Sequence, residues 1–345
     1  MGLGESGPTR SKGKARWNRD TVLFAALGWD PTWQRRLPIR TRIAWTVAVT
    51  LASCSLGGLA FIAVYFVSSP LRWISLALML LGFVMFTAVQ VILRREFLCR
   101  LDREEDQRTA REIQSRLLPA LLPGIPGIEL AAHYTPFRLI GGDYYDALPL
   151  GNSHLFIAMA DVSGKGTGAA LLTANLQATL HFALFLTRDH SLEAVAHAMN
   201  AQLAHHTAPN VFVTMVLAVL DLSAYRLRYV NAGHAPPLGL GPDGNLLRLE
   251  ATGLPLGIFE TSTYAVGEVE VPPGTALLLY TDGLSERADP SQRLYGEERI
   301  AAVLRQTAGK GAEQVIDAIT SDAERFAGGE QPHDDTALLV LRTLT

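Results

Sequence analysis

Several aspartates from residue 143 onward stand beside short apolar segments, and carboxylates placed in this way can bind a metal ion. The segments 155–160, 276–280 and 337–341 are apolar and bounded by polar or turn residues, so they are predicted to be buried strands. Acids at the ends of several buried strands can meet at one edge of a sheet, where they repel one another unless a cation neutralises them. A single Asp-Gly pair is more often a turn, but the recurrence favours a hard-metal site. The acids in question are Asp143, Asp161, Asp282 and the pair Asp334–Asp335.

The composition indicates a chain with more than one part. It has 345 residues, which is longer than one typical domain, and a net charge of −3 that is unevenly distributed. Residues 1–42 carry nine Lys or Arg and three Asp or Glu, so this segment has a charge of +6 and the remainder −9. The only cysteines are Cys54 and Cys99, which argues against a disulfide framework and a thiolate zinc site. The catalytic part is therefore expected in a reducing compartment.

Two long apolar segments predict a transmembrane helical hairpin. Residues 43–67 contain no charged residue, and in residues 73–93 the most polar side chain is Gln90. Each segment has the length of roughly 20 residues that a helix needs to cross a bilayer. The alternatives are a helix buried in a soluble core and a cleaved signal peptide. Two adjacent segments that follow a long charged head fit neither alternative well.

The flanking charges predict the orientation of this hairpin. Four arginines shortly precede the first span and four follow the second, whereas the turn 68–72 contains only Arg72. The positive-inside rule then places both termini in the cytoplasm. Three tryptophans lie among the basic residues of the tail 1–42, which suggests contact with anionic lipid. A disordered tail is the alternative.

A charged helix is predicted between the membrane segment and the globular part. Residues 94–118 are rich in Arg, Glu and Gln and contain no Gly or Pro, and Pro119 and Pro123 then break the pattern. Residues 94–123 are therefore interpreted as a linker. Its narrow apolar stripe could pair with a second copy as a short coiled coil, which would make the protein a homodimer. The alternative is a solvated spacer.

Residues 124–345 have the mixed pattern of an α+β domain. Short strands, turn clusters and a few helices follow one another without a regular βαβ repeat, which favours a sandwich of strands with helices outside. The predicted helices are 169–186, 192–205, 297–306 and 312–326. Besides the runs already given, the predicted strands are 212–220, 226–230 and 264–271.

Seven short motifs follow one another in this part of the chain. They are 111–119 (REIQSRLLP), 141–146 (GGDYYD), 161–166 (DVSGKG), 231–234 (NAGH), 281–286 (TDGLSE), 295–299 (YGEER) and 333–336 (HDDT). Any one of them is weak, but the full set in this order is highly specific. Together they resemble the bacterial SpoIIE/RsbU branch of the PP2C-type serine/threonine phosphatases. The resemblance extends over about residues 111–342, two thirds of the chain.

This resemblance implies a PP2C-like sandwich of two antiparallel β-sheets flanked by helices, with two Mn²⁺ or Mg²⁺ ions at one edge. Asp161 would bridge the two ions, and Asp335 would have a less direct, supporting role. Such ligation by oxygen alone suits Mg²⁺ and Mn²⁺. Transferred by motif, the metal ligands are the carboxylates of Asp143, Asp161, Asp282 and Asp334 and the backbone carbonyl of Val162.

The implied chemistry is hydrolysis of a phosphate monoester. A water molecule between two divalent ions becomes hydroxide near neutral pH and is aligned for in-line attack, and the ions offset the charge of the phosphoryl oxygens. No covalent enzyme intermediate is needed. The wider eukaryotic-type pattern has a histidine two positions after the bridging aspartate, where this chain has Ser163. The proton donor therefore stays open among His234, His333 and metal-bound water.

Two other enzyme classes fit the motifs poorly. A phosphate-binding P-loop at Gly164–Lys165 would need a glycine where Met159 stands. A nucleotide cyclase of the GGDEF type would need an acid at Tyr144, and it would leave the Asp282 motif unexplained. The non-enzymatic alternative is a degenerate, membrane-tethered scaffold of the same fold, although no metal aspartate is missing.

The family resemblance also implies partners and a location. The expected substrate is a phosphorylated STAS-domain anti-anti-sigma protein, bound by a domain on the cytoplasmic side of a bacterial inner or plasma membrane. Membrane lipid is a further expected partner, and no nucleic acid is expected. These expectations depend on analogy with the family.

Overall fold

The computed structural model describes one helical stretch in the predicted second span and nearly all of the globular domain. The described residues are 77, 80–92, 94–96, 111, 112, 114, 117–119 and 121–344, except 138, 139, 152, 165, 188–190 and 207–210. The chain divides into two compact units, 1–98 and 99–345. The predicted tail 1–42, the first span 43–67 and most of the linker 94–123 lie outside the described residues.

The described part of the first unit is a helix inside the predicted second span. Residues 80–92 are helical, and none of them is buried. The exposed residues include Leu81, Met85 and Phe86, which are 52–60% exposed. A helix that is apolar on all sides is typical of a membrane span. The two-span hairpin itself stays a prediction, because the first span is not described.

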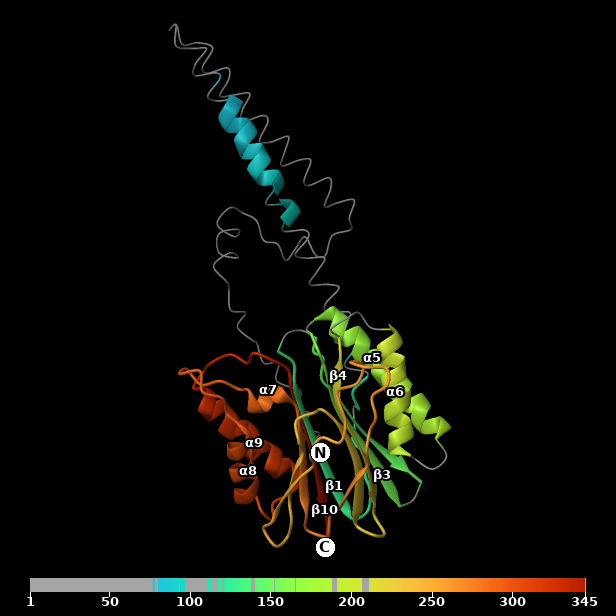
Figure 1. Ribbon diagram of the computed structural model, residues 1–345. Helices are drawn as coiled ribbons and strands as arrows, with labels where there is room; N and C mark the ends of the chain where they lie inside the picture. Colours follow the sequence, from blue (N-terminus) through green and yellow to red (C-terminus); the bar gives the residue numbers. More distant parts are fainter. Residues whose placement is uncertain are drawn as a thin grey trace, which may run out of the picture. The chain divides into compact units, whose positions relative to one another are not determined.

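Two antiparallel β-sheets, each of five strands, form the centre of the second unit (Figure 1). The first sheet has the order β1-β10-β9-β6-β7 and the second the order β2-β3-β4-β5-β8. Strands of the first sheet are β1 (Ile128–Thr135), β10 (Thr336–Thr343), β9 (Ala276–Tyr280), β6 (Leu238–Leu240) and β7 (Leu246–Arg248). Strands of the second are β2 (Tyr144–Leu150), β3 (His154–Val162), β4 (Val213–Asp221), β5 (Arg226–Ala232) and β8 (Gly267–Glu270).

Helices cover the outer faces of this sandwich (Figure 1). The second sheet is covered by α5 (Thr167–Leu186) and α6 (Leu192–His206), and the first by α8 (Glu297–Gln306) and α9 (Ala312–Ala327). A short helix, α7 (Asp282–Ser285), directly follows β9. The predicted PP2C-like sandwich of two antiparallel sheets flanked by helices is therefore confirmed.

One helix of this domain is apolar enough to be mistaken for a membrane span. Within the described residues, the stretch Gly168–Leu186 of α5 has the length and composition of a candidate span. Its side chains Leu176, Leu180 and Leu184 are buried in the core beneath the second sheet. We therefore assign α5 to the helical layer of the domain, and it lends no support to the predicted hairpin.

The differences from the predicted elements have local causes. The strand predicted at 264–271 is shorter, because Tyr264 turns into the core beside α6 and only β8 pairs with β5. Strands β6 and β7 have three residues each, too few for a periodic signal. The helices at 297–306 and 312–326 match α8 and α9 closely.

Candidate metal centre

A polar layer closes one end of the space between the two sheets. In β3 the side chains that face the other sheet are Leu155, Ile157 and Met159, and the next position in this row is Asp161. The other central strands change in the same way at this end, from apolar side chains to acids and hydroxyls. The polar positions in the layer are Asp143 beside β2, Asp161 on β3, Thr214 on β4, Thr281 beside β9 and Asp335 beside β10.

The acids in this layer are within electrostatic reach of one another. Asp143 is only 2% exposed, and its pKa is raised well above the usual range by burial and then by the charge of Asp161. The hydroxyl of Thr281 opposes this shift, since it donates a hydrogen bond of 2.7 Å to Asp143 Oδ2. Burial, followed by the charges of Asp282 and Asp334, raises the pKa of Asp161 to about 7. The structure thus brings together all four acids that the sequence singled out as ligands.

The donor set suits a hard divalent cation. The predicted ligands offer oxygen alone, and a divalent cation would offset the repulsion that, together with burial, raises the pKa values of Asp143 and Asp161. The fifth predicted donor is near, because a side chain at Gly142 would meet the Val162 carbonyl oxygen at 2.9 Å. Within the described residues, no three His, Cys, Asp or Glu side chains are yet arranged as a metal site.

Asp335 supports the segment that carries Asp143. Its carboxylate oxygens accept hydrogen bonds from the backbone N–H groups of Phe137 and Gly142, each at 2.7 Å. A side chain at Gly141 would stand 2.4 Å from the same carboxylate, so only glycine fits there. Through these contacts, Asp335 positions the loop that carries Asp143.

Gln114 supports the same loop from the other side, and the sequence analysis did not single it out. Its side chain is buried, its Nε2 donates to the Gly141 carbonyl, and its Oε1 accepts from the Gly141 N–H at 3.1 Å. The amide therefore satisfies both backbone groups of Gly141. Gln114 lies in the motif 111–119 that contributes to the family resemblance, but nothing in the sequence assigns this residue a role of its own.

A family model matches most of the domain that carries this site. The model of the family described as Stage II sporulation protein E (SpoIIE) matches residues 151–344, more than half of the chain. The chain belongs to the SpoIIE family. The predicted membership of the SpoIIE/RsbU branch of PP2C-type phosphatases is therefore confirmed.

Relatives of this SpoIIE-family chain include two curated bacterial proteins. Protein IcfG of Synechocystis sp. is 28% identical over 257 residues, which is 67% of this chain but 40% of IcfG. The phosphoserine phosphatase RsbU of Bacillus subtilis is 26% identical over 234 residues, 68% of each chain. Among solved structures, the SiaA-PP2C domain of Pseudomonas aeruginosa shares the fold, with a TM-score of 0.64 and 20% identity over 71% of this chain and 98% of that domain.

In this SpoIIE-family site, burial distinguishes the two histidines that the sequence leaves open as proton donors. His234 is 4% exposed, and burial lowers its pKa to about 4, which disfavours it as an acid facing an incoming substrate. Ser163, which stands where the wider pattern has a histidine, has a structural contact instead, because its Oγ accepts the Phe212 N–H at 2.8 Å just before β4. His333 is exposed and adjacent to Asp334 in the chain. His333 and water therefore remain as donors.

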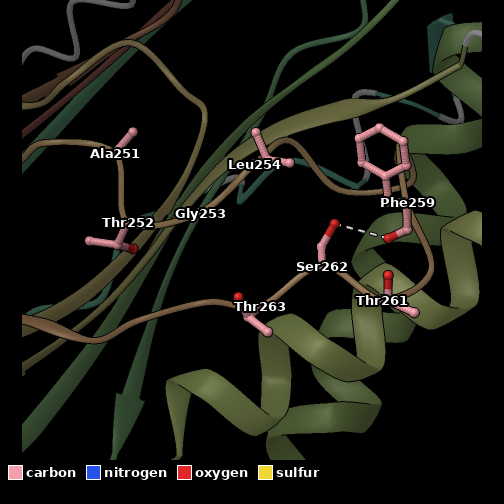
Figure 2. Close-up of a pocket in the computed structure, with 8 residues that line it drawn as sticks. All are labelled: Ala251, Thr252, Gly253, Leu254, Phe259, Thr261, Ser262 and Thr263. Atoms are coloured by element: carbon pink, nitrogen blue, oxygen red, sulfur yellow. Dashed lines mark hydrogen bonds between the residues drawn. The ribbon is translucent and has the colours of Figure 1, made fainter.

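A surface pocket elsewhere in this SpoIIE-family domain contains none of the predicted site residues (Figure 2). It has a volume of about 570 Å³ and is lined by 251–254, Phe259 and 261–263. The Ser262 hydroxyl donates a hydrogen bond of 2.9 Å to the Phe259 carbonyl and fixes one wall. No side chain in this lining titrates near neutral pH, so the chemistry is assigned to the carboxylate layer.

Replacing Gly283 by alanine is expected to destabilise the folded domain. A Cβ at this position would lie 1.8 Å from the carbonyl oxygen of Asp335, and backbone cannot yield as a flexible side chain can. We expect a loss of about 3 kcal/mol or more in the free energy of unfolding, measured by urea denaturation. The control is Gly168→Ala in α5, where no atom lies within 4 Å and alanine should stabilise by about 0.5–1 kcal/mol. Equal midpoints for both variants would contradict this packing.

The metal-free domain is expected to lose stability as the pH rises. The pKa of Asp161 is about 7 in the folded state and that of Asp143 is also raised, whereas both are near 4 in an unfolded chain. The folded state therefore binds more protons between about pH 4 and pH 7, and its stability falls across this interval. Thermal melts with a chelator at about pH 5 and pH 8 should show the lower midpoint at pH 8, and Mn²⁺ should reverse the order. A chelated midpoint that rises with pH would contradict the clustering.

Proposed function

We propose that this chain is a metal-dependent protein serine/threonine phosphatase that acts on a cytoplasmic regulator protein. The observation that carries the proposal is the layer of mutually repelling carboxylates at one end of the sheet sandwich, in a domain of the SpoIIE family. Buried acids with raised pKa values are costly to maintain without a ligand, and they mark functional sites more often than structural ones.

In this proposal, the side chains of Asp143, Asp161, Asp282 and Asp334 and the Val162 carbonyl hold two divalent cations, Mn²⁺ or Mg²⁺. Bound ions of this kind activate water and offset charge on a phosphoryl group. Thr281 holds Asp143 by its hydrogen bond, and Asp335 and Gln114 hold the backbone on either side of Gly141. The protein thus supplies a layer of negatively charged groups, and no side-chain nucleophile is required.

The substrate that we propose is phosphoserine or phosphothreonine on a STAS-domain anti-anti-sigma protein. The relative RsbU is a phosphoserine phosphatase and is similar over 68% of its own length, which supports this class of substrate. The chain spans only 40% of the length of IcfG, so the comparison with that relative applies to the phosphatase domain alone.

We further propose that residues 43–67 and 73–93 anchor the protein in a bacterial membrane with the phosphatase domain in the cytoplasm. The helix 80–92, which exposes apolar side chains on all sides, supports the second of these spans. Pairing of residues 94–123 between two copies would complete a membrane-bound homodimer. Contact of the basic tail 1–42 with anionic lipid is part of the same proposal.

The direct test is phosphate release from a phosphoserine peptide or a phosphorylated STAS protein by the full chain. Release should require Mn²⁺, stop with EDTA and be lost in Asp282→Asn, whereas Asp317→Asn on the exposed surface of α9 should behave as wild type. A metal-loaded, folded protein that releases no phosphate from any of these substrates would favour the non-catalytic scaffold.

A further inference from the structure

The segment 231–234 is fixed by several buried hydrogen bonds and close contacts, and the proposed chemistry gives it no role. Asn231 is fully buried, and its Oδ1 accepts the His234 N–H at 2.8 Å. Its Nδ2 donates to the Leu249 carbonyl at 3.0 Å. Gly233 has a φ of 67°, and a side chain there would meet Pro255 at 2.6 Å. These contacts fix the backbone from which the His234 ring projects.

The two nitrogens of the His234 ring have different surroundings. Nδ1 lies 2.8 Å from the hydroxyl oxygen of Thr214. Nε2 is buried and has no hydrogen-bond partner among the described residues, and the backbone of Tyr280 acts on the ring. Because burial disfavours the charged ring, His234 is neutral and carries one proton. Nδ1 has a hydroxyl partner that can donate, so we assign Nδ1 as the acceptor of the Thr214 O–H and place the single ring proton on Nε2.

Thr214 stands directly beside a predicted metal ligand. It is the partner of Asp161 in the antiparallel pair of β3 and β4, so both side chains project from the same face of the sheet. Both side chains are partly exposed at the end of the inter-sheet space. The Thr214 hydroxyl is therefore part of the polar layer, and His234 lies behind it, away from solvent.

We propose that His234 and Thr214 act as a positioning pair that orients the water consumed in the hydrolysis. The Thr214 O–H donates to Nδ1 of His234, which leaves only lone pairs of its oxygen directed toward the site. Such an oxygen can accept a hydrogen bond from water but has no proton to offer a phosphoryl oxygen. The pair thus selects water as the molecule held beside Asp161, and this inference rests on the proposed phosphatase function.

Kinetics of the full chain with Mn²⁺ and a phosphoserine peptide test the role of Thr214. Thr214→Val has the same shape without the hydroxyl and should lower kcat by about 10- to 100-fold with little change in KM. Thr214→Ser should restore most of the rate. Thr320→Val removes a threonine that bonds only to the backbone of α9, and it should match wild type. A loss that appears in KM alone, or a serine variant as slow as valine, would overturn the proposal.

A second measurement does not depend on activity. Nitrogen NMR of the full chain with ¹⁵N-labelled histidine reports the protonation of each ring, and His234→Asn identifies the signal of His234. We expect a neutral ring with its proton on Nε2 near neutral pH, and a change at Nδ1 in Thr214→Val. A charged ring or a proton on Nδ1 would overturn the proposal. If the wild type releases no phosphate but this tautomer is found, the proposed function fails while the His234–Thr214 geometry stands.

Discussion

Asp143→Asn is expected to abolish phosphatase activity and, in the absence of metal, to raise the stability of the domain. Asp143 is the most buried of the four predicted carboxylate ligands, and its pKa is raised by burial and by the charge of Asp161. An asparagine keeps the shape and still accepts the hydrogen bond from Thr281, but it carries no charge. The free energy of unfolding should therefore rise where the aspartate would be ionised, because the buried repulsion is removed.

The two effects of Asp143→Asn have separate readouts. We expect phosphate release to fall by at least about 10²- to 10³-fold, since a charged group that holds the reacting centre is lost. The chelated melting midpoint should rise by about 2–4 °C at pH 8, and the shift that Mn²⁺ causes in wild type should shrink. Calorimetry in EDTA and in Mn²⁺ measures both.

Asp221→Asn is the matched control for this prediction. Asp221 is at the end of β4, where its carboxylate accepts a hydrogen bond of 2.6 Å from the Ser223 hydroxyl, and these bonds lower its pKa. Its neutralisation should leave activity unchanged and lower the midpoint slightly. If Asp143→Asn lowered the chelated midpoint at pH 8 as well, Asp143 would be a stabilising ion and the metal-centre interpretation would fail.

The acids of the site could be found from the sequence because each adjoins a strand that is itself easy to recognise. The run 276–280 ends at Asp282 after one residue, and the run 155–160 ends at Asp161, so strand and ligand were predicted together. Both runs are long and apolar enough to give a clear signal. The order of the strands in the sheets was not needed for that step.

The supporting residues could not be found in this way, because their partners are far away in the sequence. Thr214 belongs to the site through its register opposite Asp161, and Thr281 through a bond to Asp143. Hydroxyls are common in strands, and nothing in the sequence marks these two. Only the register of the paired strands shows that they occupy the same layer as the carboxylates.

The role of the histidines could not be predicted from the sequence either. His234 was one candidate for the proton donor because it stands in a motif, but burial makes it neutral and removes it from the substrate side. Motif position indicates that a residue matters and leaves its role open. Depth within the fold decides between acid and positioning residue.

Gln114→Ala is expected to damage both the stability of the domain and its metal centre. Gln114 is 4% exposed, and its side-chain amide makes hydrogen bonds to both the N–H and the C=O of Gly141. Alanine leaves both buried backbone groups without their partner, which costs about 2–4 kcal/mol in the free energy of unfolding. Since Asp143 is two residues along the same loop, we also expect phosphate release to fall by about 10- to 100-fold.

Gln314→Ala is the matched control, because its Oε1 also accepts an N–H from a glycine, Gly311, at 3.2 Å, but on the exposed surface of α9. It should cost a few tenths of a kcal/mol and leave the rate unchanged. Urea denaturation and a Mn²⁺ titration of the rate compare the two variants. Gln114→Ala with wild-type stability and rate would show that the loop is held by Asp335 alone.

The position of Gln114 in the chain connects this prediction to the linker that precedes the domain. Gln114 belongs to the segment 94–123 that the sequence predicts as the linker between membrane and domain, and Leu117 in the same segment accepts a hydrogen bond of 2.6 Å from Gln177 of α5. The end of the linker is therefore attached both to the Asp143 loop and to the helix that follows the Asp161 motif. Gln177→Ala should then lower the rate less than Gln114→Ala, because it frees the linker from α5 and leaves Gly141 fully bonded. An equal loss in both variants would mean that the whole segment, rather than the amide of Gln114, holds the metal centre in shape.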